Sequence, residues 1–266
     1  MAGQMSDGDG KVAIITGGGT GVGAATALML AERGWRCVVT YSRSAAEAED
    51  TAGRCTAKGP KAIAVRGDVA SDDECRAVVA AARNAFGRVD ALVNNAGTTK
   101  FASMDDLGLQ NAGDFHDIYA VNVIGAYQMA RAAAPAMREA GAGAVVNVSS
   151  ISALTGNGSS FAYVCSKAAL NTLTFGLARA LSPHIRVNCV LPGVIESRWL
   201  KNGLGDDTYE AVKTGYANAA ALGRPCKPED VADAIAWLVE GAGLVTGQLI
   251  TVDGGFLLGR PPRVSR

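Results

Sequence analysis

Tyr163 and Lys167 are spaced so that they can do acid–base chemistry together. They stand four residues apart in the segment 147–167, which reads NVSSISALTGNGSSFAYVCSK, and on a helix this spacing places both side chains on one face. A phenol has an ordinary pKa of about 10, so it exchanges protons poorly near neutral pH. A nearby ammonium group stabilises the phenolate, and we therefore expect Lys167 to lower the pKa of Tyr163 toward the working range.

Ser150 adds a hydroxyl group to the same segment. The apolar run from Ala144 to Val148 is typical of a buried strand, and Ser150 follows its end. From there the hydroxyl can hydrogen-bond the substrate oxygen that Tyr163 protonates. A Tyr-x-x-x-Lys pair alone is common on helix surfaces, so this interpretation as a hydroxyl/carbonyl proton-transfer site depends on the rest of the chain.

A glycine-rich turn near the N-terminus predicts an anion site. The residues 11–16, KVAIIT, are typical of a strand buried on both faces, and an Ala/Leu-rich helix is expected over 24–33. Between them lies GGGTGVG, with Gly17, Gly21 and Gly23 spaced as TG-xxx-G-x-G. Such a turn collects unpaired N–H groups at the positive end of a helix dipole, and this suits a pyrophosphate.

The end of the second expected strand, 37–41, bears on which dinucleotide binds. An acidic residue often follows the glycines by about 20 residues and accepts from the adenosine ribose. Tyr41, Ser42 and Arg43 stand there instead, and Arg43 can pair with a 2′-phosphate. We therefore favour NADP(H). NAD(H) stays possible, because Arg43 can also simply face solvent.

Taken together, these segments resemble the short-chain dehydrogenase/reductase family. The resemblance rests on the glycine turn, on the NNAG at 94–97, and on the set Ser150, Tyr163 and Lys167. Within the family, the chain resembles the 3-oxoacyl-carrier-protein reductase-like group. Alternating strands and helices over 11–257 likewise predict one α/β, Rossmann-type, doubly wound domain with a largely parallel seven-stranded sheet and helices on both faces. Residues 1–10 and 258–266 are expected to be flexible tails.

The resemblance implies a catalytic role for each of four residues. Tyr163 is the expected general acid/base, Lys167 lowers its pKa and binds the ribose hydroxyls, and Ser150 orients the carbonyl. Ser149 is a rival for that last role, but Ser150 has the better spacing. Asn122, within a helix expected over 115–137, is implied to perturb that helix locally and to hold a water that links Lys167 to solvent.

The resemblance also implies the cofactor contacts. The expected cofactor-binding residues are Gly17, Thr20, Gly21, Val22, Gly23, Tyr41, Ser42, Arg43, Asp68, Val69, Asn95, Ala96, Gly97, Tyr163, Lys167, Pro192, Gly193, Ile195 and Ser197.

Three of these positions carry an open question. Asp68 is expected to contact the adenine, although an Asx turn before the following helix is equally compatible with it. Thr20 stands where NADP-preferring relatives often have a basic residue, and Ser197 replaces the family's Thr near the nicotinamide.

Composition excludes several classes of function. The 266 residues carry zero formal net charge, which argues against electrostatic binding to nucleic acid or to a membrane. The six cysteines lack a CxxC and the two histidines lack a carboxylate pattern, so no metal site is expected. Reduced thiols and a polar opening, MAGQMSDGDG, without a signal-peptide core favour a cytoplasmic protein.

The sequence thus predicts an NADP(H)-dependent oxidoreductase that interconverts a small-molecule carbonyl and a secondary alcohol. The alternatives are an NAD-dependent alcohol dehydrogenase of the same family and a non-catalytic dinucleotide-binding regulatory subunit. Residues 199–222 lack firm periodicity and are expected to form a mobile substrate lid. A mostly apolar pocket is expected from Trp199, Leu200, Leu204, Tyr209, Tyr216, Leu154 and Phe161.

The resemblance alone implies a homo-oligomer. In relatives the helices equivalent to 115–137 and 161–181 pair across subunits, usually in symmetric tetramers. The other interpretation is that their apolar faces simply cover the sheet.

Overall fold

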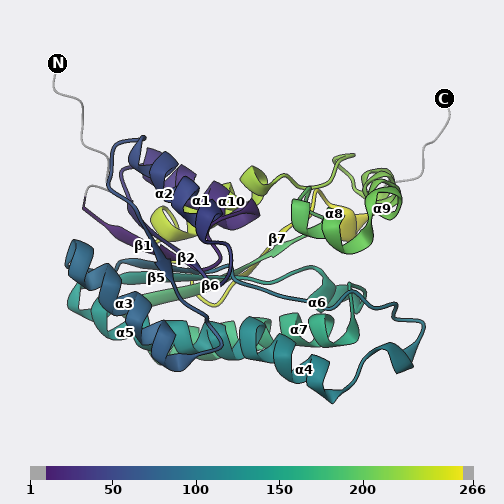
Figure 1. Cartoon of the computed structure of the whole chain (residues 1–266), viewed down its shortest axis with the longest axis horizontal. Helices are drawn as coiled ribbons and strands as arrows, with labels where there is room; N and C mark the ends of the chain where they lie inside the picture. The colour runs from purple at the N-terminus through teal and green to yellow at the C-terminus, as the bar shows by residue number, and fades with distance from the viewer. Residues whose placement is uncertain (1–9, 260–266) are drawn as a thin grey trace.

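A seven-stranded parallel sheet forms the centre of the protein. The computed structural model describes residues 10–259, and its strands follow the order β3-β2-β1-β4-β5-β6-β7 (Figure 1). The strands are β1 Val12–Ile15, β2 Arg36–Tyr41, β3 Ile63–Arg66, β4 Ala91–Asn94, β5 Gly143–Val148, β6 Ile185–Pro192 and β7 Leu249–Val252. Every neighbouring pair is parallel, which confirms the predicted Rossmann-type sheet.

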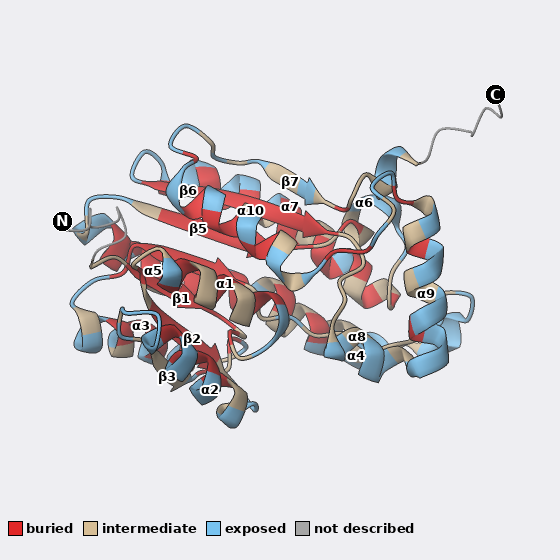
Figure 2. Cartoon of the chain, turned by 90° about the horizontal axis from the view of Figure 1, so that it is seen from above, coloured by how far each residue is buried: buried red, intermediate tan, exposed pale blue. Residues whose placement is uncertain are grey.

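Helices cover both faces of this sheet. In Figure 1, α1 Gly21–Glu32, α2 Ala45–Thr56 and α10 Pro228–Glu240 lie on one face, and α3 Asp72–Phe86, α5 Ala126–Glu139 and α7 Phe161–Leu181 lie on the other. Four shorter or peripheral helices gather at one end of the molecule, namely α4 Ala112–Tyr119, α6 Ser152–Thr155, α8 Arg198–Leu204 and α9 Asp206–Ala219 (Figures 1 and 2). Single 3₁₀ turns occur at Leu107–Leu109 and Phe256–Leu258.

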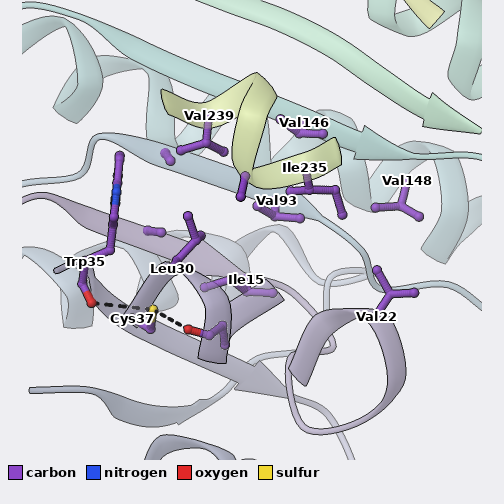
Figure 3. Packing of buried hydrophobic residues seen from close by; sticks show 14 of the residues in the cluster. Ile15, Val22, Leu30, Trp35, Cys37, Val93, Val146, Val148, Ile235 and Val239 are labelled. Atoms are coloured by element: carbon purple, nitrogen blue, oxygen red, sulfur yellow. Dashed lines mark hydrogen bonds between the residues drawn. The ribbon is translucent and has the colours of Figure 1, made fainter. Parts of the chain in front are cut away.

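The inner strands of the sheet are buried because their apolar side chains face helices on both sides. Residues 12–15 of β1 are all fully buried, as expected for a central strand of a parallel sheet. On one face, Ile15, Val93 and Val146 pack toward Leu30 of α1 and Ile235 of α10 (Figure 3). A second cluster on the opposite face joins the strands to α3, α5 and α7. The buried residues in Figure 2 follow these layers.

Local signals set some element boundaries closely. Helix α3 begins at Asp72, because the preceding Ser71 accepts a hydrogen bond from the Glu74 amide. Gly87, at φ 82°, takes the left-handed conformation that ends it.

The helix expected over 115–137 is interrupted. It consists of α4, a π-helical turn η2 at Ala120–Gly125, and α5. Asn122 lies in this turn, so the expected local perturbation of the helix is present. Gly125 closes the turn where a Cβ atom would approach the Val69 backbone oxygen to 3.0 Å, so the two segments meet more closely than a larger residue allows.

The expected lid is more regular than its sequence suggests. Residues 199–222 contain most of α8 and all of α9. Tyr209 and Tyr216 are buried, at 7% and 4% exposed, and their expected place in a mostly apolar pocket stays a prediction. The Tyr216 hydroxyl donates to the Asp253 carbonyl at 2.6 Å and its ring stacks on Phe256 at 4.5 Å. This packing anchors α9 to the C-terminal end of the described chain.

The tails predicted at 1–10 and 258–266 fall almost wholly outside the described residues. Within the described part, Leu258 belongs to the last 3₁₀ turn.

Candidate active site

The proposed catalytic residues converge beyond the carboxyl ends of β4 and β5. Tyr163 and Lys167 lie in the first two turns of α7, and Ser150 follows β5 by two residues. Helix α7 begins at Phe161 because Ser160 accepts from the Tyr163 amide at 3.3 Å, while the side-chain oxygen of Gln110 accepts from the Phe161 amide at 2.7 Å. These two caps fix where the helix starts and hence where Tyr163 lies.

Tyr163 and Lys167 share one face of α7, as their spacing predicts. The Lys167 ammonium nitrogen lies 5.6 Å from the centroid of the Tyr163 ring. It donates a hydrogen bond to the Val148 carbonyl at 2.8 Å, at the end of β5. Lys167 is only 4% exposed, so the cation is held between helix and strand rather than in solvent.

Burial governs the proton affinities of this pair. It raises the pKa of Tyr163 to about 12, with a smaller opposing effect from a hydrogen bond with Ser150. It lowers the pKa of Lys167 to about 8. The direction for Tyr163 is opposite to the one expected from the Tyr–Lys spacing, because desolvation of the phenolate outweighs any help from the ammonium. Tyr163 therefore holds its proton near neutral pH.

The structure separates Ser150 from its rival Ser149. The Ser149 side chain is buried and its hydroxyl donates to the Lys167 carbonyl at 3.0 Å, so it ties β5 to α7. Ser150 is partly exposed, and its hydroxyl accepts from the Ser152 amide at 3.1 Å. Ser150 is also the serine whose side chain is hydrogen-bonded with Tyr163.

Asn122 is built into the same site through the π turn. Its amide donates to the Thr98 carbonyl at 3.0 Å and to the Ser166 hydroxyl at 2.9 Å, and its oxygen accepts from the Thr98 amide at 2.8 Å. A Cβ atom on Gly97 would lie 3.5 Å from both the Asn122 oxygen and the Lys167 nitrogen. Asn122 and Lys167 therefore border the same small space beside Gly97.

The glycine turn is folded too tightly for side chains. A Cβ atom on Gly23 would overlap the Gly17 carbonyl and lie 2.6 Å from the Asn95 amide nitrogen. Gly17 and Gly21 have φ values of 59° and 53°, which favour glycine. Asn95 holds the turn by donating to the Thr16 and Gly17 carbonyls at 2.9 and 3.0 Å.

The first turn of α1 suits an anion. Thr20 precedes the helix in an extended conformation without a side-chain cap, and the first turn, which includes Val22, contains no acidic residue. Its leading N–H groups and the helix dipole therefore face the glycine turn without a competing negative charge. The donor set and the crowded cradle fit the pyrophosphate of a dinucleotide.

The adenosine side of the expected cofactor site lies beyond β2 and β3. Tyr41 ends β2, and Ser42 and Arg43 are exposed just after it. The Arg43 side chain forms no ion pair with any other residue of the range 10–259. The Asp68 side chain accepts from the Ala70 amide at 3.0 Å, so the Asx turn is present.

Val69 is a buried residue next to the Asx turn at Asp68. It is 7% exposed, and its carbonyl accepts from the Gln128 side chain at 3.1 Å. This contact ties the end of β3 to α5.

The nicotinamide side is formed by the segment after β6. The Gly193 amide donates to the Val252 carbonyl at 2.9 Å, next to Pro192. Ile195 pairs with Cys226 in an isolated parallel bridge, and the bridge bonds use the backbone groups of residues 194 and 196. The N–H and C=O groups of Ile195 therefore point away from Cys226. The Ser197 hydroxyl accepts from the Leu200 amide at 3.3 Å and starts α8.

Sequence reasoning missed several positioning residues. The Thr16 hydroxyl accepts from the Asn95 and Ala96 amides at 3.0 and 2.9 Å, joining the first strand to NNAG. Ser166 accepts from Asn122 and donates to the Tyr163 carbonyl at 2.7 Å. A hydroxyl at a strand end was the available signal for Thr16, whereas the contact of Ser166 with Asn122 depends on the packing of the π turn η2 against α7.

The family models agree with this geometry. A model described as enoyl-(acyl carrier protein) reductase matches residues 17–257, which span the glycine turn, the catalytic segment and the last strand. The chain belongs to the short-chain dehydrogenase/reductase family. As a member of this family it is an oxidoreductase that acts on CH–OH and C=O groups with a nicotinamide dinucleotide.

Relatives of this short-chain dehydrogenase/reductase cover nearly its whole length. It is 39% identical over 244 residues to a protein of Streptomyces violaceoruber named ketoacyl reductase 2 of the granaticin polyketide synthase, covering 92% of this chain and 95% of the relative. It is 34% identical to the 3-oxoacyl-[acyl-carrier-protein] reductase of Staphylococcus aureus, covering 93% and 98%. A solved 7α-hydroxysteroid dehydrogenase in complex with NADH and a 7-oxo bile acid superimposes with a TM-score of 0.85 at 32% identity, covering 93% and 94%.

Proposed function

We propose that this protein interconverts a carbonyl and a secondary alcohol with NADP(H), using Tyr163 as general acid/base. The observation that carries the proposal is the meeting of Ser150, Tyr163 and Lys167 at the sheet edge onto which the glycine turn opens. A bound nicotinamide would supply the hydride. The residues of the chain then have to orient the carbonyl and supply or accept one proton.

Each side chain has a definite task in this proposal. Tyr163, protonated near neutral pH, donates its proton to the oxygen that becomes the alcohol. Ser150 donates a hydrogen bond to that oxygen and polarises the carbonyl. Lys167 binds the ribose hydroxyls and passes a proton back to the Tyr163 phenolate that remains after the transfer. Asn122 connects the Lys167 region to solvent through the π turn.

The preference for NADP(H) rests on the end of β2. Ser42 offers a donor, and Arg43 a cation that has no ion-pair partner within residues 10–259, at the position where an acidic residue would repel a 2′-phosphate. Preference for NAD(H) is the competing outcome, as in the relative solved with NADH.

We further propose a homotetramer that works in the cytoplasm on a small neutral substrate. Supporting this, the cysteines are free thiols, and Ile124, Tyr127 and Phe175 are exposed on the helices expected to pair. None of the helices between residues 10 and 259 is long and apolar enough to span a bilayer.

Replacing Tyr163 by phenylalanine tests the proposed chemistry. Tyr163→Phe removes the acidic proton but retains the ring, so ketone reduction should fall by about 10²–10⁴-fold while NADPH binding changes little. The decrease of NADPH absorbance with each ketone of a panel gives the rate, and a titration followed by NADPH fluorescence gives the affinity. Substantial turnover in Tyr163→Phe would remove Tyr163 from its role, whereas binding without turnover of any ketone by the wild type would favour a regulatory subunit.

A further inference from the structure

Aromatic side chains from separate parts of the chain meet beside the catalytic tyrosine. Trp199 of α8 lies with its ring centroid 6.4 Å from that of Tyr163 and 5.4 Å from that of Phe101. The rings are tilted by 42° and 53°, respectively. Phe101 follows the NNAG segment, so the cluster joins the end of β4, the start of α7 and the lid.

The pair of Phe101 and Trp199 is held in place by close packing. A Cβ atom on Gly203, one turn after Trp199 on α8, would overlap the Phe101 ring, so the ring lies directly against the helix backbone. The segment carrying Phe101 is tied to α7 because the Ala102 amide donates to the Ser159 carbonyl at 2.9 Å. The lid is thus fixed relative to Tyr163 through this aromatic contact.

An ion pair holds the other side of α8. The Arg198 guanidinium contacts the Glu47 carboxylate of α2 at 3.0 Å, across the glycine turn. Glu47 thus neutralises the charge of Arg198, the residue that precedes Trp199. The other cations nearby in sequence are also paired, Lys100 with Asp114 at 2.9 Å and Lys201 with Asp206 at 3.4 Å.

Trp199 itself keeps a large open surface. It is 47% exposed, although its neighbours Phe101 and Tyr163 are both partly covered. An indole that is fixed on one side, open on the other and surrounded by paired charges offers a flat apolar surface at the reacting centre. Flat rings stack on such a surface with more contact than a flexible chain does.

We propose that Trp199, supported by Phe101, determines substrate specificity by stacking on a neutral ring next to the reacting carbonyl. The substrate class is then a cyclic or aryl ketone rather than an open-chain or anionic one. This inference rests on the proposed role of Tyr163, because it takes the ketone oxygen to lie at that phenol.

Two ketones with the same number of carbons test the proposal, α-tetralone with a fused ring and methyl octyl ketone without one. In NADPH-linked assays, Trp199→Ala should lower kcat/KM for α-tetralone by about tenfold or more, mainly through KM, and for methyl octyl ketone by less than about threefold. Trp199→Phe should retain most of the α-tetralone activity. Gly203→Ala, which displaces Phe101, should shift selectivity in the same direction as Trp199→Ala.

Trp237 provides a matched control. It is 46% exposed on α10, so Trp237→Ala removes an equally exposed indole far from Tyr163 and should change neither ketone's kinetics. Equal losses for both ketones in Trp199→Ala, or no loss for either, would overturn the inference.

A binding measurement keeps this test separate from the proposed function. Trp35, Trp199 and Trp237 are the three tryptophans, and Trp35 is 3% exposed. Added α-tetralone should quench the fluorescence of the wild type and of Trp237→Phe but not that of Trp199→Phe. Quenching through Trp199 without turnover of any ketone would contradict the proposed function alone, and the same quenching in Trp199→Phe would contradict the stacking site.

Discussion

At the scale of single residues, burial opposes ionisation of both Tyr163 and Lys167. The pKa of Tyr163 is raised to about 12, so the phenol is present in the form that donates a proton during carbonyl reduction. Lys167 is held by the Val148 carbonyl, yet its pKa is lowered to about 8 because little water reaches the ammonium. Near neutral pH Lys167 thus stays charged although its burial disfavours the charge. Such perturbed groups are common at functional sites.

Lys167→Met should therefore make the protein more stable near neutral pH while it removes activity. The folded protein holds the Lys167 proton less tightly than the unfolded chain, where the pKa is 10.5. This destabilisation is complete below about pH 8 and fades as pH rises through the unfolded value. After allowing for the lost hydrogen bond to Val148, we expect a gain of about 1–2 kcal/mol in the free energy of unfolding near neutral pH.

Urea denaturation of both proteins at neutral pH and near pH 10 measures this effect. The gain should shrink at the higher pH, because the folded wild type then holds Lys167 largely uncharged and the unfolded chain begins to lose its proton as well. Lys201→Met is the control, since Lys201 is half-exposed on α8 and should give no such pH-dependent gain. A gain equal at both pH values would contradict a burial penalty on Lys167.

Arg43 carries the prediction on cofactor choice. Arg43→Ala removes the exposed guanidinium at the end of β2, so NADPH affinity should fall by about tenfold or more while NADH affinity changes little. Titration of both dinucleotides measures the ratio. Arg54→Ala, on the same side of the sheet in α2 but paired with Asp50, should leave the ratio unchanged. Equal affinity of the wild type for both cofactors would exclude the proposed preference.

At the scale of elements, the glycine turn and the π turn are both shaped by close approaches of backbone. The first brings α1 to the ends of β1 and β4, where Asn95 binds two of its carbonyls. The second brings Asn122 to Thr98 and packs Gly125 on Val69. The glycine turn thereby joins two parts of the expected cofactor site, and the π turn joins such a part, at Val69, to the catalytic candidate Asn122.

Gly23→Ala should disrupt the glycine turn. The added methyl group would meet the Gly17 carbonyl and the Asn95 amide, so the turn must open, and dinucleotide affinity should fall by about 100-fold or more. Gly53→Ala is the matched control, because its Cβ atom would meet nothing within 4 Å in α2. That variant should bind normally and gain about 0.5–1 kcal/mol in stability. Unchanged affinity in Gly23→Ala would show that the turn does not cradle the phosphates.

At the scale of the whole molecule, the parallel strands end at a single edge, where the glycine turn, NNAG, Ser150 and the segment after β6 meet. Helices α8 and α9 lie at the same end (Figures 1 and 2), and Tyr216 anchors α9 to Asp253. On one side, the proposed substrate site is therefore bordered by helices α8 and α9, which are packed on the rest of the domain.

The proposed tetramer gives the prediction at this scale. Ile124 is 50% and Phe175 41% exposed on the helices expected to pair, so Ile124→Glu with Phe175→Glu should place charges in the interface and yield smaller particles. Size-exclusion chromatography with light scattering measures the mass. Leu244→Glu adds charge at a fully exposed loop residue and should keep the wild-type mass. A wild-type monomer would refute the tetramer.

Features that depend on residues close together in the chain could be predicted from the sequence. Strand β1 lies within the apolar run 11–16 that predicts it, and Tyr163 and Lys167 share a face because an α-helix repeats every 3.6 residues. The glycine turn follows from the residues that it contains. The largely parallel, seven-stranded sheet is predicted by the alternating elements together with the family resemblance.

Features that depend on contacts between distant parts of the chain became visible in the folded structure. It distinguished Ser150 from Ser149, reversed the expected pKa shift of Tyr163, and turned most of the unpatterned segment 199–222 into α8 and α9. It also brought Trp199 to Phe101. Desolvation and side-chain packing depend on what the rest of the folded chain places around a residue, and local spacing carries no information about those neighbours.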